Sequence, residues 1–284
     1  KKQPQDILKI CRDAIESNNF MKGSLFLKIE DLTNIDKQFL LERHLVSKEL
    51  ITKSDSKAVE ISDKEIISIM INEEDHIRLQ TIQSGFNLRQ AWQIIDALDT
   101  DLSNKMDFAF STDLGFLTAC PTNTGTGMRA SVMLHLPALV ITKQINRILQ
   151  AISKFSLTAR GFYGEGTQAS GNFFQFSNQL TLGQNESEIV DGLERVIRQV
   201  VEHEKEARSY LLEKRRGKVE DQIWRAVGSL KSSRLMTSTE ALGLLSLARL
   251  GIDLVFIPNL SKANLNALFL FTQPAHLQKL NGGE

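Results

Sequence analysis

The change of pattern at Gly183 constrains the fold of this chain more than any other feature. Before it, runs of β-branched residues, which are typical of strands, mix with helix-like stretches. After it, Glu186 to Lys214 has the pattern of one long helix, and further helices are expected at Val219 to Leu230, Ser238 to Leu250 and Ser261 to Phe271. The sequence therefore predicts an α+β core followed by an all-helical C-terminal region.

Three short runs in the first part are predicted strands, because β-branched residues dominate them. They are Val59 to Ile61, Ile66 to Ile71 and Ile77 to Ile82, and the letters NEED occupy the turn between the last two. Leu88 to Leu102 carries apolar residues at helical spacing, and Asn87 is available as the N-cap of that helix.

The remainder of the first part is interpreted as further strands and one helix. Phe108 to Phe110 and Arg129 to Leu136 are expected to be extended, and Pro137 is expected to open a helix that runs to about Ile152. The segments SLTARGFYGEG and NFFQFSNQLTLG predict a strand pair joined by a glycine-containing loop.

Charge and cysteine content exclude several classes of protein. The 284 residues include 34 Lys plus Arg and 34 Asp plus Glu, so the formal net charge is zero, whereas a general binder of nucleic acid or anionic membranes normally has a basic excess. Two cysteines, Cys11 and Cys120, are too few for a disulfide framework or a cysteine zinc site. No run reaches the roughly 18 apolar residues of a membrane span. We therefore expect a cytoplasmic protein with no nucleic-acid or membrane partner.

Three loops combine an arginine with glycine or acidic residues. The first, CPTNTGTGMRAS, includes Arg129, whose planar guanidinium suits phosphate. A Rossmann fingerprint would open a helix and a P-loop would continue with Gly-Lys-Ser/Thr, and neither context is present. Taken alone, a glycine turn beside an arginine is more often plain structure.

The other two loops are NEEDHIRLQ and ARGFYGEG. In the first, Arg78 lies in an otherwise apolar strand, where an unpaired charge is costly, so it needs an anion. In the second, Arg160 and Glu165 flank a turn. A solvated turn and a surface ion pair are the simpler interpretations of these loops. Taken together, converging arginines would neutralise nucleotide phosphates and a transferring phosphoryl group, and two carboxylates opposite them would hold a guanidinium.

The motifs resemble a known family. NEEDHIR, CPTNTGTGMRASVMLHLPAL and RGFYGEG are similar, in order and spacing, to the signature segments of the phosphagen (guanidino) kinases. LLERHLVS, ITKQINRI, SNQLTLG and the C-terminal LLSLARLGIDL and LFLFTQPAHLQ resemble the bacterial protein-arginine kinase branch. The resemblance implies a catalytic domain at residues 1–207, built on an antiparallel β-sheet core flanked by helices. It implies a helical C-terminal region at residues 208–284 for dimerisation or substrate docking.

The resemblance also implies roles for individual residues. Glu74 matches the catalytic carboxylate that binds the guanidino group and acts as a base, and Glu165 matches a second carboxylate that clamps it. Cys120 matches a cysteine beside the guanidinium, where positive charge favours the thiolate. From composition alone, a buried structural thiol is the simpler interpretation of Cys120. The implied ATP-binding residues are His44, Arg78, Arg129, Ala130, Ser131, Val132, Met133, Arg160, Gly161, Phe162, Tyr163 and Gly164. Mg²⁺ would be bound mainly through the nucleotide phosphates, so no metal-ligating residue is assigned.

Two family motifs do not occur in this sequence. The first is a Ser-x-Arg-x-Arg segment that supplies further phosphate-binding arginines, and we expect it upstream of Lys1. The second is the Arg-Asp-x-x-Arg-Ala motif of a phosphoarginine pocket used for allosteric control, and no such string occurs before Glu284.

The function implied by the resemblance is transfer of the γ-phosphoryl of ATP to arginine guanidino groups in proteins, in protein quality control. The chain reads Gly-Thr-Gln after Gly-Glu, as bacterial protein-arginine kinases do, where metabolite kinases read His-Thr-Glu. A free-guanidino kinase and a non-catalytic adaptor that keeps the family fold are the alternatives. The implied partners are protein substrates bearing arginine, a zinc-binding activator protein, a Clp-type unfoldase or protease, and a second copy in a homodimer.

Overall fold

Two units make up the fold, each built around its own antiparallel sheet. The computed structural model describes residues 4–52, 55–161 and 170–282. The first unit comprises Lys1–Met128, Leu180–Val190 and Gln278–Glu284. The second comprises Arg129–Gln179 and Asp191–Leu277. The predicted α+β class with a helical C-terminal region is confirmed.

The first unit contains a four-stranded sheet in the order β1-β2-β3-β4, with each neighbouring pair antiparallel. In its third strand, Ile69 faces one apolar cluster and Met70 faces another, because successive side chains of a strand point to opposite faces. The three strands predicted from β-branched runs are confirmed as β2, β3 and β4. The bounds are β1 (Leu25–Lys28), β2 (Ala58–Ile61), β3 (Ile67–Ile71) and β4 (Ile77–Thr81).

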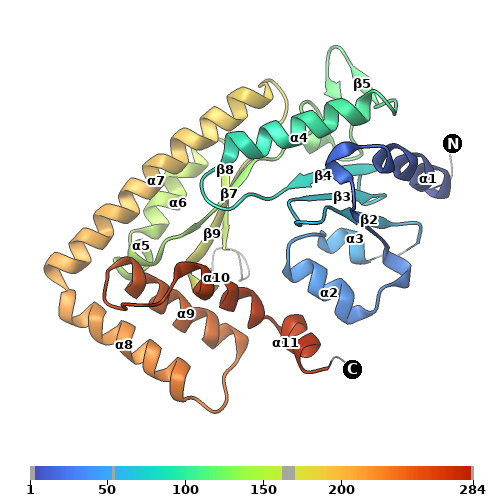
Figure 1. The fold of residues 1–284 in the computed structure, drawn as a ribbon. Coiled ribbons are helices and arrows are strands. Elements are labelled where there is room, and N and C mark those ends of the chain that lie inside the picture. Colours follow the sequence, from blue (N-terminus) through green and yellow to red (C-terminus); the bar gives the residue numbers. More distant parts are fainter. Residues whose placement is uncertain (1–3, 53–54, 162–169, 283–284) are drawn as a thin grey trace. The chain divides into compact units, whose positions relative to one another are not determined.

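Helices cover both faces of this sheet (Figure 1). Helices α1 (Pro4–Glu16) and α4 (Leu88–Ser103) pack on the face of Ile69. Helices α2 (Asn34–Glu42) and α3 (Lys48–Thr52) pack on the opposite face. Both faces of the sheet are therefore buried, which explains why β3 is apolar almost throughout.

A short hairpin of β5 (Phe110–Ser111) and β6 (Gly115–Phe116) follows α4. Gly125, in the GTG stretch, pairs with Phe116 and has φ 115°. A Cβ at this position would collide with the backbone of Thr181. Gly125 is therefore required by close backbone packing, and no ligand is needed to explain it.

The second unit is built on a three-stranded antiparallel sheet in the order β7-β9-β8. Its strands are β7 (Ser131–His135), β8 (Leu157–Gly161) and β9 (Phe173–Asn178). The extended stretch expected at Arg129 to Leu136 and the expected strand pair are confirmed. The loop of that pair, residues 162–169, lies outside the described residues.

Helices make up the rest of the second unit. Figure 1 shows α8 and α9 side by side, and α7 contacts the start of α5 (Pro137–Ile141) through Glu204. Within the described parts of the chain, no helix combines the length and apolar character needed to cross a membrane. The bounds are α7 (Glu186–Lys214), α8 (Arg216–Ser232), α9 (Ser238–Asp253), α10 (Lys262–Phe271) and α11 (Pro274–Leu280).

One local prediction is confirmed only as to position, and another is wrong. Asn87 is the N-cap residue of α4, as expected, but its side chain makes no capping hydrogen bond, and its Nδ2 donates to the Ser84 carbonyl at 2.8 Å. The single helix expected from Pro137 to Ile152 is two helices, α5 (Pro137–Ile141) and α6 (Ile145–Ser153). Lys143 between them has φ 61°, a left-handed conformation that no α-helix accommodates.

A buried carboxylate joins α7 to the start of α5. The Glu204 carboxylate accepts hydrogen bonds from the amides of Ala138 and Leu139 at 3.1 and 3.0 Å, and from Arg208 Nε at 2.8 Å. Burial raises the pKa of Glu204, and the Arg208 charge and the two amides partly oppose that effect. Glu204 therefore satisfies helix amides that would otherwise be buried without partners.

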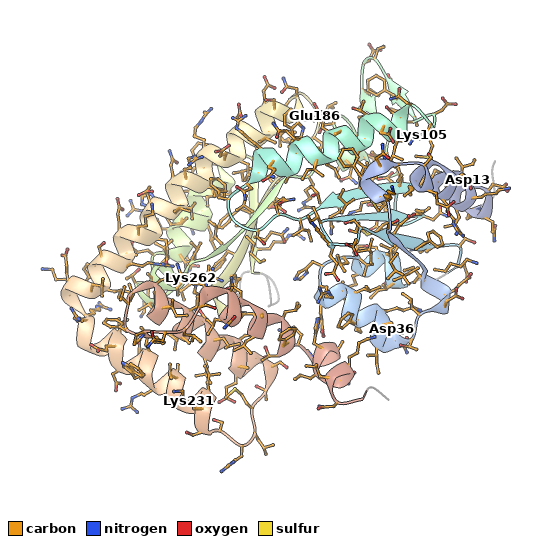
Figure 2. All side chains as sticks on the ribbon, viewed as in Figure 1. Asp13, Asp36, Lys105, Glu186, Lys231 and Lys262 are labelled. Carbon is orange, nitrogen blue, oxygen red and sulfur yellow. The ribbon has the colours of Figure 1, made fainter. Side chains whose placement is uncertain are left out.

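Arg208 extends this network to α9. Its Nη1 donates to Asp253 Oδ2 at 2.8 Å, and Asp253 also pairs with Lys262, which is labelled in Figure 2. Burial acts to raise the pKa of Asp253, but the bonds from Lys262 and Arg208 outweigh it and lower the pKa. The network thus ties four helices of the second unit together, α5, α7, α9 and α10.

His135 is a buried histidine that should make stability depend on pH. Its ring faces Ser246, Phe173 and the charges of Arg249 and Arg208. Burial, with those two positive charges, holds the pKa of His135 well below its ordinary value of 6.5. The unfolded chain therefore takes up a proton at His135 that the folded chain does not, and the free energy of unfolding should fall as pH drops below 6.5.

His135→Gln should make this decline with pH shallower, because glutamine takes up no proton. Urea unfolding at about pH 7.5 and about pH 5.5 measures the difference. His76→Gln, at an exposed histidine, is the matched control and should keep the wild-type decline. Equal declines in the His135 variant and the wild type would refute this account of His135.

Candidate active site

Glu74 lies in the hairpin between β3 and β4. A backbone hydrogen bond of 3.0 Å from Asn72 N–H to the His76 carbonyl closes the hairpin, with Asn72 at φ 58°. The Asn72 side-chain amide also donates to the Ser56 carbonyl at 2.7 Å. The loop is therefore well anchored, while the Glu74 side chain is exposed to solvent.

Glu73 has the opposite environment. Its side chain is 5% exposed, Oε1 accepts from Arg78 Nη1 at 2.9 Å and from Ser47 Oγ, and Oε2 accepts from the Glu74 amide at 2.7 Å. Burial acts to raise the pKa of Glu73, but the bonds from Ser47 and the Glu74 amide and the Arg78 charge outweigh it and lower the pKa. Glu73 is therefore the anionic partner that the position of Arg78 in an apolar strand predicted. The Arg78 side chain is still 46% exposed.

The ERHLVS segment is joined to this hairpin. Ser47 bonds Glu73, and Gln80 Nε2 donates to the His44 carbonyl at 2.6 Å. His44 has φ 60°, and burial lowers its pKa. The backbone of His44 is therefore tied to the strand that carries Arg78.

Cys120 is brought toward the same hairpin by Asp75. Asp75 Oδ1 accepts from the Ala119 amide at 2.6 Å, which links the loop of Glu74 to the residue before Cys120. Cys120 is partly exposed, and its Sγ lies 2.9 Å from Thr122 Oγ1. The predicted residues of the first unit, His44, Glu74, Arg78 and Cys120, therefore belong to segments that contact one another.

The remaining predicted residues that the structure describes lie on the sheet of the second unit. Residues directly opposite each other on antiparallel strands share a face. Two polar rows cross one face: Ser131–Ser177–Thr158 and Met133–Gln175–Arg160. Arg160, Ser131 and Met133 are therefore on one face, and all three are exposed.

Arg129 reaches across the same face. Its Nη2 donates to Ser177 Oγ at 3.2 Å, and Ser177 Oγ lies 2.9 Å from Thr158 Oγ1. Gln175 Nε2 donates to Ser131 Oγ at 3.1 Å. The exposed Arg129, Arg160 and Ser131 thus share one surface, a donor set that suits phosphate oxygens, while Ser177 is buried.

Other predicted residues do not present side chains to this face. Val132 lies opposite the fully buried Phe176, on the reverse of the sheet. Ala130 is buried, and its amide donates to Asn178 Oδ1 at 2.8 Å. Gly161 pairs with Phe174 on the reverse face. Four predicted residues lie outside the described part of the chain: Phe162, Tyr163, Gly164 and Glu165.

A hollow of about 400 Å³ in the first unit is separate from these residues. Its lining includes Phe110, Leu114, Leu182 and Glu186. None of the residues predicted for catalysis or ATP binding lines it. We therefore do not assign it to the candidate active site.

Sequence reasoning missed the side chains that hold the predicted ones. Glu73 and Asp75 lie within the NEED motif, so their chemistry was visible, but their partners Ser47 and Ala119 are 26 and 44 residues away. Gln175 lies between Arg160 and Met133 in the sheet only because β9 is the central strand. The strand pattern of the sequence indicates extended segments and not their lateral order.

Comparison with known families identifies the family to which this chain belongs. Residues 6–207 match the family model described as "ATP:guanido phosphotransferase, C-terminal catalytic domain". The chain belongs to the ATP:guanido phosphotransferase family. Residues 216–284 match the model described as "Protein-arginine kinase McsB C-terminal domain". The resemblance drawn from the motifs is confirmed.

Curated relatives in the phosphotransferase family are similar along nearly the whole chain. A protein-arginine kinase from Desulforamulus reducens is 47% identical over 281 residues, which is 98% of this chain and 79% of the relative. A protein-arginine kinase from Brevibacillus brevis is 50% identical over 278 residues, 97% of this chain and 78% of the relative.

Solved structures of guanidino kinases share the fold. The duplicated taurocyamine kinase from Schistosoma mansoni matches 71% of this chain and 29% of its own, with a TM-score of 0.64 and 25% identity. A lombricine kinase structure matches 71% of this chain and 59% of its own, with a TM-score of 0.63 and 22% identity. The antiparallel core flanked by helices is therefore the fold of phosphotransferases that act on guanidino compounds.

Proposed function

We propose that this chain transfers the γ-phosphoryl group of ATP to the guanidinium of arginine side chains in proteins. The observation that carries the proposal is the match of residues 6–207 to the catalytic model, followed by the match of residues 216–284 to the protein-arginine kinase C-terminal model. The second match favours protein arginine over a small guanidino metabolite as the acceptor.

The proposed reaction needs a base and a set of cations. A guanidinium has a pKa of about 12.5 or higher, so it becomes a nucleophile only as a carboxylate takes its proton. The exposed Glu74 accepts that proton while the new N–P bond forms and the bond from the γ-phosphorus to ADP breaks. Glu165 holds the other side of the guanidinium, and Cys120 lies beside it. Arg78, Arg129 and Arg160 neutralise the charge that develops on the phosphoryl oxygens.

Magnesium enters this proposal through the nucleotide. Among the described residues, no group of three or more His, Cys, Asp or Glu side chains is arranged to hold a metal ion. The polar sheet face offers guanidinium and hydroxyl donors, which fit phosphate oxygens. The residues therefore fit a Mg²⁺ that is bound by phosphate oxygens and water and that screens their charge.

Arg160→Ala should raise the KM for ATP roughly tenfold or more, because the variant loses a charge-assisted contact with phosphate. Steady-state kinetics with a protein acceptor measures it. Arg198→Ala is the matched control, since Arg198 is 65% exposed on α7 and pairs with Glu194. The control should keep the wild-type KM for ATP. An equal KM for ATP in the two variants would show that Arg160 does not contribute to nucleotide binding.

The acceptor is tested by supplying radiolabelled ATP with Mg²⁺ to the full-length protein, with either casein or arginine as the acceptor. The expected result is acid-labile label on casein and little ATP consumed with arginine alone. Rapid ATP consumption with arginine alone would favour a free-guanidino kinase. Label on neither, with no heat of Mg-ATP binding in calorimetry, would favour a non-catalytic adaptor.

The helical region at residues 208–284 is proposed as the surface for dimerisation or for docking substrates. Exposed apolar side chains support this role, among them Leu235 at 92% and Val255 at 84% exposure. We also propose that the protein works in the cytoplasm, with a zinc-binding activator protein and a Clp-type unfoldase or protease as its partners. Sedimentation of the full-length protein tests the dimer, and a monomer at all concentrations would contradict it.

A further inference from the structure

The turn that leads into β9 has an unusual backbone. Gly171 and Asn172 have φ values of 69° and 58°, so two successive residues are left-handed. Such a conformation in a non-glycine residue persists only when its surroundings enforce it. The Asn172 carbonyl accepts from the Leu136 amide at 2.9 Å, which ties the turn to the end of β7.

The C-terminal helical region supplies the rest of these surroundings. Ser246, on α9, is fully buried, and its Oγ lies 2.7 Å from Asn172 Nδ2 and 2.8 Å from His135 Nε2. A Cβ on Gly171 would lie 3.3 Å from the Leu242 carbonyl oxygen of the same helix. One hydroxyl from α9 therefore joins the turn to β7.

The next residue extends the contact. Phe173 packs edge-on against Phe269 of α10 with ring centroids 4.9 Å apart, in one apolar cluster with Leu242 and Leu245 of α9. The start of β9 is thus held by hydrogen bonds and by apolar packing from α9 and α10. Helices beyond residue 237 therefore contact each of the residues that lead into this strand.

The position of Asn172 matters to the reaction through the strand that follows it. Strand β9 carries Gln175 and Ser177, which bond Ser131 and Arg129 on the polar face. Any displacement of this turn therefore reaches Arg129 and Ser131, which the proposed function places at the phosphates.

We propose that Ser246 is a positioning residue for phosphotransfer, which acts through Asn172 to set where β9 begins. This inference rests on the proposed function. It makes the helical region part of the catalytic apparatus, in addition to any docking role. Catalysis is sensitive to such placement, because a shift of about 1 Å in a reacting group lowers rates by up to about 100-fold.

Ser246→Ala in the full-length protein should lower kcat about tenfold and leave the KM for ATP within about twofold. Asn172→Gly should have the same effect, because glycine accepts the left-handed backbone but lacks the amide. The double variant should be no slower than either single one, because both changes break the same link. Ser209→Ala, at an exposed serine on α7, is the control and should keep the wild-type kcat.

A folded Ser246→Ala protein with wild-type kcat would overturn the proposal, and so would losses that multiply in the double variant. If Ser246→Ala does not fold, as judged by circular dichroism, Asn172→Gly serves as the test. A wild-type kcat in Asn172→Gly would then overturn the proposal. Absence of transfer by the wild type would overturn the proposed function itself. Wild-type transfer with unaffected variants would overturn only the role of Ser246.

Discussion

Glu74→Gln is expected to lower kcat for arginine phosphorylation by about 10²- to 10⁴-fold, the range that a general base contributes. Glutamine keeps the size of the side chain but takes up no proton, so the acceptor guanidinium stays charged. The Glu74 side chain is exposed, and the contact that holds the loop uses its backbone amide, so the fold should persist. Phosphoarginine formed on a protein acceptor, quantified by mass spectrometry, measures the loss.

Asp63→Asn is the matched control for Glu74. Asp63 is an exposed carboxylate in the turn between β2 and β3 of the same sheet, and its loss should leave kcat within about twofold of the wild type. Melting curves should coincide for the three proteins. Phosphoryl transfer by Glu74→Gln at the wild-type rate would show that Glu74 is not the base of the reaction.

Glu204→Ala is expected to lower the free energy of unfolding by about 3–5 kcal/mol, the cost of breaking a buried ion pair by removing one partner. The change removes one of the two carboxylates that pair with Arg208, leaving Asp253, and it leaves the amides of Ala138 and Leu139 without their acceptor. The Glu204 and Arg208 side chains are 6% and 21% exposed, so water replaces the lost contacts poorly. Urea unfolding followed by circular dichroism measures the loss.

Glu206→Ala provides the comparison on the same helix. Glu206 is 74% exposed and pairs across the surface with His203, so its removal should change stability by less than about 0.5 kcal/mol. Equal, small losses in the two variants would show that the Glu204 network does not support the second unit.

Much of the fold could be predicted from the sequence, because its signals are local. Runs such as Ile67–Ile71 are β-branched and apolar, and the sheet buries them on both faces. The helix break at Lys143 could not be predicted, because LVITKQINRI contains neither proline nor glycine. Its left-handed conformation depends on how α5 and α6 pack in the folded protein.

The candidate site could be predicted in its motifs but not in its supports. Two adjacent glutamates look alike in the sequence, yet Glu73 is buried by Ser47 and Arg78 while Glu74 faces solvent. The alternation of β7 does not reveal that His135 is buried against a serine 111 residues later. Such contacts follow from tertiary packing, which no local pattern encodes.

The central claim is that Glu74 and the arginines of the polar sheet face act on one pair of substrates. A crystal structure of the full-length protein with Mg-ADP, an arginine-containing peptide and nitrate in place of the transferring phosphoryl group tests it most directly. The account predicts a Glu74 oxygen within about 2.6–3.2 Å of the peptide guanidinium, and Arg129 and Arg160 at similar distances from the phosphates. A nucleotide bound away from both arginines, with Glu74 contacting no part of the peptide, would contradict it.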